Sequence, residues 1–170
     1  PPQRYGDMYS LNGFVKELNE QGFLCCYNHP FWSLQNYDDY KDLRGLFAME
    51  IYNHGCELDG LYGYASQSYD EMLRTGMQLA CLATDDNHDC HPLGDPLNDS
   101  FGGWTVIRAQ ALTYPDVMDA LQKGAFYAST GPELKELFIQ DNALHIKCSP
   151  VEKIYIITES RSCKMKLALP

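Results

Sequence analysis

The sequence lacks features that mark several classes of protein. Its 170 residues contain no apolar run near the roughly 20 residues of a membrane-spanning helix, and no secretory signal is visible. Lys and Arg total 13 against 23 Asp and Glu, which gives a net charge of −10. Such a surface repels phosphate backbones, so we do not expect general nucleic-acid binding. Because the sequence has no membrane-length apolar run, we expect no membrane partner either. The negative charge does not exclude a phosphorylated small substrate, because a bound metal ion makes the local electrostatic potential positive.

The seven cysteines are odd in number and form no C-x-x-C motif. Cys25, Cys26 and Cys81 lie in apolar, strand-like runs, where a free thiol acts as a small hydrophobic group. This usage predicts a reducing, cytoplasmic environment. The chain begins with Pro1-Pro2 rather than Met, and we expect it to be part of a longer protein.

Helical and strand-like patterns alternate along most of the chain. Helices are predicted near residues 10–22, 38–43, 68–76 and 113–124, and strands near 23–27, 46–52, 79–83, 104–109 and 126–129. Ser68 is the expected N-cap of the third helix, and Thr113 caps the fourth. The alternation predicts an α/β fold with parallel strands, whose C-terminal edge carries the chemistry.

The last 40 residues have a different pattern. Short strand-like runs near residues 137–139, 143–148, 151–158 and 165–169 follow one another without a helix, and Asp141-Asn142 is a turn signal. We therefore predict an α/β region over residues 1–133 and a small antiparallel β appendage over 134–170. Open sheet edges in such a chain favour self-association into a homo-oligomer.

Polar residues gather where the predicted strands end. The four groups are Asn28-His29, Glu50 with Asn53-His54, Asp86 with His88, and Ser129-Thr130. Residues i and i+2 of an extended chain point to the same side, so Asp86 and His88 can aim a carboxylate and an imidazole at one point. That pair suits a divalent metal. The alternative is a polar loop that caps the following helix.

The neighbouring candidates also have structural alternatives. His29 is either a ligand at the same edge or a buried histidine bonded to nearby backbone. Glu50 lies inside an apolar strand, so it faces a cation, an Arg or solvent on the opposite side of the sheet. Asn53 and His54 are expected in a surface loop, and Trp32 either lines a pocket or packs in the core.

The spacing His88-x-Cys90-His91 offers donors for Zn²⁺, but no second Cys/His cluster stands nearby to complete four ligands. Cys90 is disfavoured as a nucleophile. The acids around it, Asp86 and Asp89 among them, raise a thiol pKa and reduce the thiolate.

Five motifs in order give the sequence a family resemblance. They are Asn28-His29-Pro30, EIYN at residues 50–53, ATDDNH at 83–88, GGWTVIRA at 102–109 and FYASTGPE at 126–133. Together they resemble the later part of the polymerase-and-histidinol-phosphatase (PHP) superfamily, especially the bacterial PHP-type metal-dependent phosphoesterases. The resemblance covers residues 22–133 and implies the C-terminal part of a distorted β/α barrel with a multinuclear metal centre.

The resemblance implies metal ligands at His29, Asp86 and His88, with Asp86 also acting catalytically. Glu50, Asn53 and Asn28 become supporting or substrate-contacting residues. The family's first ligands come from an N-terminal His-x-His, which this sequence does not contain. We expect Mn²⁺, Fe²⁺ or Zn²⁺ as cofactor and a small phosphate mono- or diester as substrate. The alternatives are a hydrolase of a non-phosphate ester, amide or carbamate, and a non-catalytic binding module.

Overall fold

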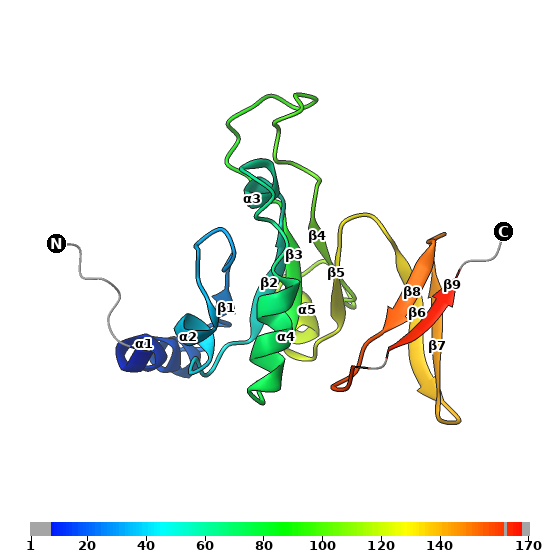
Figure 1. Ribbon diagram of the computed structural model, residues 1–170, viewed down its shortest axis with the longest axis horizontal. Coiled ribbons are helices and arrows are strands. Elements are labelled where there is room, and N and C mark those ends of the chain that lie inside the picture. The colour runs from blue at the N-terminus through cyan, green and yellow to red at the C-terminus, as the bar shows by residue number, and fades with distance from the viewer. Residues whose placement is uncertain (1–7, 162, 168–170) are drawn as a thin grey trace. The chain divides into compact units, whose positions relative to one another are not determined.

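The structure is a computed structural model that describes residues 8–161 and 163–167. The chain divides into two compact units, Pro1–Thr130 and Gly131–Pro170. Figure 1 shows the elements of each unit, coloured along the chain. The first unit combines helices with a parallel sheet, and the second contains antiparallel strands.

A three-stranded parallel sheet is the centre of the first unit. Its strands are β1 (Cys26–Tyr27), β2 (Ala48–Asn53) and β3 (Ala80–Thr84), hydrogen-bonded in the order β1-β2-β3. Met49 of β2 lies opposite Tyr27 and Cys81. Five of the six residues of β2 are buried, as expected for a central strand of a parallel sheet. The predicted parallel arrangement is confirmed for these three strands.

Four helices precede β3 in the sequence: α1 (Met8–Glu20), α2 (Tyr37–Tyr40), α3 (His54–Leu58) and α4 (Ser66–Arg74). The main core cluster joins α2, α4 and the sheet through Tyr40, Leu43, Met49, Ala65, Met72 and Leu79. The predicted N-cap of α4 is wrong. The helix begins two residues before Ser68, and its N-cap Ala65 makes no side-chain capping bond.

Two further strands, β4 (Trp104–Ile107) and β5 (Phe126–Ser129), flank helix α5 (Tyr114–Gln122). They pair antiparallel, so the parallel pairing that the alternation predicted is wrong here. The hydroxyl of Thr105 bonds both backbone groups of Ala83, which ties β4 to β3 through a side chain. Thr113 caps α5 as predicted. The strands within the described residues form no closed barrel.

The second unit consists of two antiparallel pairs, β6 (Leu134–Gln140) with β7 (Ala143–Cys148) and β8 (Lys153–Ile156) with β9 (Lys164–Leu167). Asp141 and Asn142 join β6 to β7 with φ angles of 50° and 59°. Two consecutive positive φ angles indicate a type I′ hairpin turn, which Asp and Asn tolerate. Most residues of these strands are exposed. In the described part of the chain, no helix has the length and hydrophobicity of a membrane span.

Candidate metal and phosphate site

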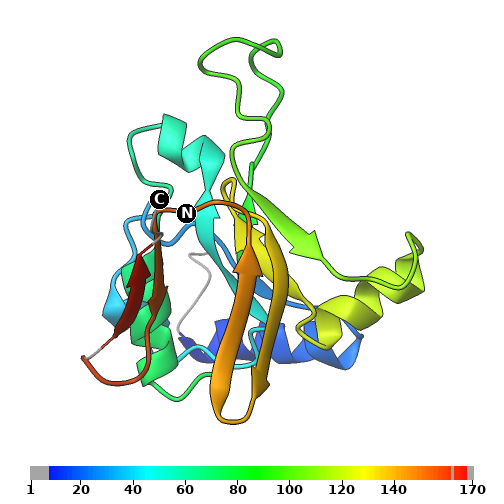
Figure 2. The ribbon, with the colours of Figure 1, turned by 90° about the vertical axis from the view of Figure 1, so that its right-hand side faces the viewer.

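The C-terminal ends of β2 and β3 lead into the same region of the first unit. Helix α3 (His54–Leu58) starts immediately after β2, and residues 85–103 form a long loop after β3. Figures 1 and 2 both show this loop extending beyond the sheet beside α3. Sequence reasoning missed α3. The feature of the sequence that could have indicated this helix is Asn53, a favoured N-cap residue, whose side chain accepts the Cys56 N–H at 2.8 Å.

Asp85 holds the base of the long loop. Its carboxylate accepts backbone N–H groups from Phe101, Gly102 and Gly103 at 2.6, 2.8 and 2.9 Å. Its own carbonyl accepts the N–H of Gly55 in α3 at 2.9 Å. One residue therefore closes the loop and fastens it to the helix, which fixes where the next residue, Asp86, emerges.

A cavity of about 550 Å³ lies between the loop, α3 and the segment after β1. Its lining includes all three residues predicted as metal ligands, His29, Asp86 and His88. Trp32 and Asp99 also line it. The first ligand comes from a segment more than 50 residues before the other two in sequence, so the fold brings the two motifs to a single space.

Glu50 connects the strand ends beneath this cavity. The side chain is buried, and its Oε2 accepts the backbone N–H of His29 at 2.8 Å and the Asn53 amide at 3.0 Å. The hydroxyl of Thr84 donates to Oε1. Both oxygens are thus satisfied by protein donors, which makes a buried carboxylate tolerable. The buried side chain does not face solvent, and its hydrogen-bond partners among the described residues are His29, Asn53 and Thr84 rather than an Arg; a cation beside Glu50 stays a prediction.

Asn53 extends the network to Asp86. Its Nδ2 also donates to Asp86 Oδ2 at 3.0 Å, and the residue is fully buried. The expectation of a surface position for Asn53 is therefore wrong, while its predicted supporting place beside the site agrees with this contact. Within the described residues, Oδ1 of Asp86 accepts no hydrogen bond, so one carboxylate oxygen is available to a ligand.

His29 and Asp86 both have left-handed backbone conformations, with φ angles of 31° and 51°. Residues with a Cβ adopt positive φ at a cost of order 1 kcal/mol or more. Glu50 helps to hold His29 through its backbone N–H. Asp85, the residue before Asp86, is held in place because its carboxylate accepts three N–H groups from the far end of the loop.

The His29 ring is fixed by its own segment. Its Nδ1 lies 3.0 Å from Ser33 Oγ, and its ring meets the Trp32 ring edge-to-face at a centroid distance of 5.3 Å. Trp32 in turn donates its indole N–H to Asp59 at 2.7 Å. With Nδ1 engaged by the hydroxyl, Nε2 is the ring nitrogen left for a ligand, an arrangement typical of metal-binding histidines.

The donor set fits a divalent metal in kind, because it offers imidazole nitrogens and a carboxylate oxygen. Across residues 8–161 and 163–167, however, no three His, Cys, Asp or Glu side chains form a group close enough to hold an ion. The His88 side chain is 65% exposed, so its ring has room to rotate toward Asp86. The metal site predicted from the sequence stays a prediction.

The cysteine of α3 does not add a nucleophile to the cavity. Burial, together with the nearby carboxylates of Asp86 and Glu50, raises the pKa of the Cys56 thiol to about 12. A thiol with this pKa carries almost no thiolate near neutral pH. Cys90 is exposed, and its Sγ lies 3.6 Å from the carbonyl oxygen of His88.

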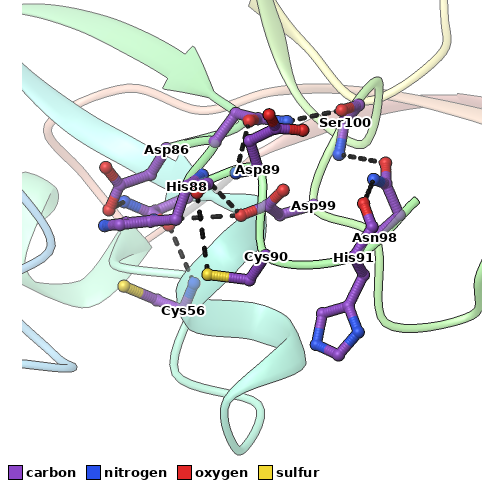
Figure 3. A network of polar contacts seen from close by, with 11 residues as sticks. Cys56, Asp86, His88, Asp89, Cys90, His91, Asn98, Asp99 and Ser100 are labelled. Carbon is purple, nitrogen blue, oxygen red and sulfur yellow. Dashed lines mark hydrogen bonds and ion pairs between the residues drawn. The ribbon is translucent and has the colours of Figure 1, made fainter. Parts of the chain in front are cut away.

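Other predicted site residues lie elsewhere. Asn28 is exposed and is not among the residues that line the cavity, and Ser129 and Thr130 line a different pocket beside β2. His54 places its Nδ1 2.9 Å from the hydroxyl of Tyr52. Sequence reasoning also missed Asp99, which lies beside His88 in Figure 3. No local spacing marks it, because its partner is 11 residues away.

No protein-family model, curated protein or solved structure matches this chain significantly. The resemblance to the PHP superfamily therefore remains a prediction from the motifs.

Proposed function

We propose that the cavity belongs to a metal-dependent phosphoesterase that hydrolyses a small phosphate mono- or diester. The supporting observation is that His29, Asp86 and His88, from two separate segments, line one space. Each has a donor atom without a protein partner in the described residues: Nε2 of the two imidazoles and Oδ1 of the carboxylate. An acidic chain needs a cation to receive a phosphate, and these donors are the means to hold one.

His29, Asp86 and His88 would hold the metal together with ligands from outside the described residues. A bound divalent metal lowers the pKa of water and neutralises phosphate oxygens. Asp86 would orient the attacking water and take its proton through Oδ1, because Asn53 occupies only the other oxygen. Glu50 keeps the His29 backbone in place, and Trp32 forms an apolar wall against the rest of the substrate.

The test is a metal titration combined with two substrates. The 170-residue chain, and any natural polypeptide that extends it upstream, is stripped with EDTA and supplied with Mn²⁺, Fe²⁺ or Zn²⁺. We expect metal-stimulated release of nitrophenol from p-nitrophenyl phosphate. Asp86→Asn should lower the rate by about 10²- to 10⁴-fold, the usual contribution of a general base.

Asp89→Asn is the matched control, because Asp89 is an exposed acid of the same loop whose carboxylate makes no contact with the cavity network. It should leave the rate within about twofold, in line with small effects of surface substitutions. Hydrolysis of phenyl acetate alone would replace the proposal with the non-phosphate hydrolase. If neither substrate is hydrolysed with or without added metal, by this chain or by the extended polypeptide, the result would support a non-catalytic module.

A further inference from the structure

We infer that Asp99 is a positioning residue that sets the His88 imidazole so that its Nε2 faces the metal. Asp99 Oδ2 accepts the backbone N–H of His88 at 2.8 Å and lies 3.8 Å from the ring Nδ1 (Figure 3). The Asp99 side chain is 13% exposed, whereas that of His88 is 65% exposed. A largely buried carboxylate thus holds the backbone of an exposed histidine and lies close to one nitrogen of its ring.

The second oxygen of Asp99 supports a functional reason for this placement. Among the described side chains that are not exposed, Asp99 Oδ1 is a buried oxygen without a hydrogen-bond partner. A buried carboxylate oxygen without a hydrogen-bond partner is unfavourable for folding. The loop of residues 85–103 does not need Asp99 to close, since Asp85 already accepts three N–H groups at the base of the loop.

The chemistry of histidine ligands gives Asp99 its role. A metal-binding imidazole commonly donates its second ring N–H to a carboxylate or a carbonyl, which fixes the tautomer and the ring orientation. At 3.8 Å the contact between Nδ1 and Oδ2 is longer than a hydrogen bond, and a small rotation of the exposed ring closes it. At His29 the hydroxyl of Ser33 lies 3.0 Å from Nδ1, which leaves Nε2 as the ring nitrogen without a protein partner there too.

This inference rests on the proposed function for the identity of the ligand, but its first test does not. The metal-free chain, labelled with ¹⁵N-histidine, is examined by long-range ¹H–¹⁵N NMR at about pH 8, above the ordinary histidine pKa. We expect the His88 ring to carry its proton on Nδ1 and the unprotonated nitrogen to be Nε2. A His88 ring protonated on Nε2 overturns the inference, and no variant is needed to read that result.

The second test measures Zn²⁺ affinity by chelator competition. Asp99→Asn should weaken Zn²⁺ binding by about 10- to 100-fold, the usual effect of removing the partner of a ligand histidine. Asp89→Asn makes the same change of charge in the same loop and should stay within about twofold. Equal affinities of wild type and Asp99→Asn overturn the inference, whereas Zn²⁺ binding without phosphate hydrolysis overturns only the proposed function.

Discussion

Asn53 joins Glu50 to Asp86 through a single amide group. Its amide nitrogen donates one hydrogen bond to each carboxylate, both at 3.0 Å, and its amide oxygen accepts the N–H of Cys56 as the N-cap of α3. Glu50 lies in β2 and Asp86 in the loop after β3, and two carboxylates this close would repel each other in a buried setting without a donor between them. The Asn53 amide, a neutral donor, bridges the two carboxylates and fixes the direction of Asp86.

Asn53→Asp should therefore be among the most destabilising single-atom changes in this chain. It turns the shared amide donor into a third carboxylate in a buried network, and we expect a loss of roughly 3–5 kcal/mol in the free energy of unfolding. Urea unfolding followed by circular dichroism measures it. Gln67→Glu is the control, since Gln67 makes a similar 3.0 Å contact to Glu71 on the exposed surface of α4; a similar loss in both variants would contradict the network.

The sequence carried enough information to place the candidate site at the strand ends. Apolar runs stop at Asn28-His29 and at Asp86, and parallel strands bring such ends to one edge, which the observed pairing of β1, β2 and β3 confirms. The role of Glu50 was out of reach, because its donors come from residues 21 and 34 positions away. Hydrophobic periodicity predicts where helices and strands lie, but it does not predict which distant donor will contact a buried carboxylate.

The direction of β4 and β5 was also beyond the pattern. A helix between two strands is typical of a parallel crossover, yet α5 connects an antiparallel pair. Helix α3 was hidden because HGCEL is short and has a Gly at its second position, which lowers helix propensity. The cap at Asn53 determines its start more strongly than the composition of the helix itself.

Gly102→Ala should disrupt the loop that carries Asp86 and His88. A Cβ at this position would lie 2.0 Å from Cγ of His54, so the imidazole must move and lose its 2.9 Å contact with Tyr52. We expect a loss of roughly 1–3 kcal/mol, the usual cost of overpacking. Thermal unfolding measures it.

Two variants check this explanation. Gly13→Ala, in α1, meets no atom within 4 Å and should raise stability by about 0.5–1 kcal/mol. Combining Gly102→Ala with His54→Ala should recover part of the loss, because the clashing ring is gone. Strictly additive effects of the two substitutions would show that the clash does not cause the destabilisation.

The thiols of Cys56 and Cys26 should react slowly with alkylating reagents. Burial is the main cause that raises the pKa of Cys56 and Cys26 to about 12, against an ordinary value of 9.0. Only the thiolate reacts, and a pKa raised by three units lowers its fraction at pH 8 by about a thousandfold. Iodoacetamide labelling read by mass spectrometry should therefore modify exposed Cys90 and Cys163 first.

The same pKa values predict how stability responds to alkaline pH. Below about pH 9 the thiols are neutral in both the folded and the unfolded chain, so they contribute no pH dependence. Between about pH 9 and 12 the unfolded thiols ionise while the folded ones keep their protons, so stability falls as pH rises. Cys56→Ala should make this fall shallower in urea titrations, and an unchanged slope would contradict the raised pKa of Cys56.

Trp32 should determine how well the cavity binds an aromatic ester. Its side chain is 45% exposed in the cavity, its ring is set against His29, and its N–H is held by Asp59 at 2.7 Å. Trp32→Leu removes an aromatic face worth about 0.5–1.5 kcal/mol, so KM for p-nitrophenyl phosphate should rise about 2- to 12-fold while kcat stays nearly constant. Tyr37→Leu is the control, since Tyr37 is an exposed aromatic that does not line the cavity. A fall in kcat at unchanged KM would instead place Trp32 in the positioning of His29 and remove it from the substrate-binding wall.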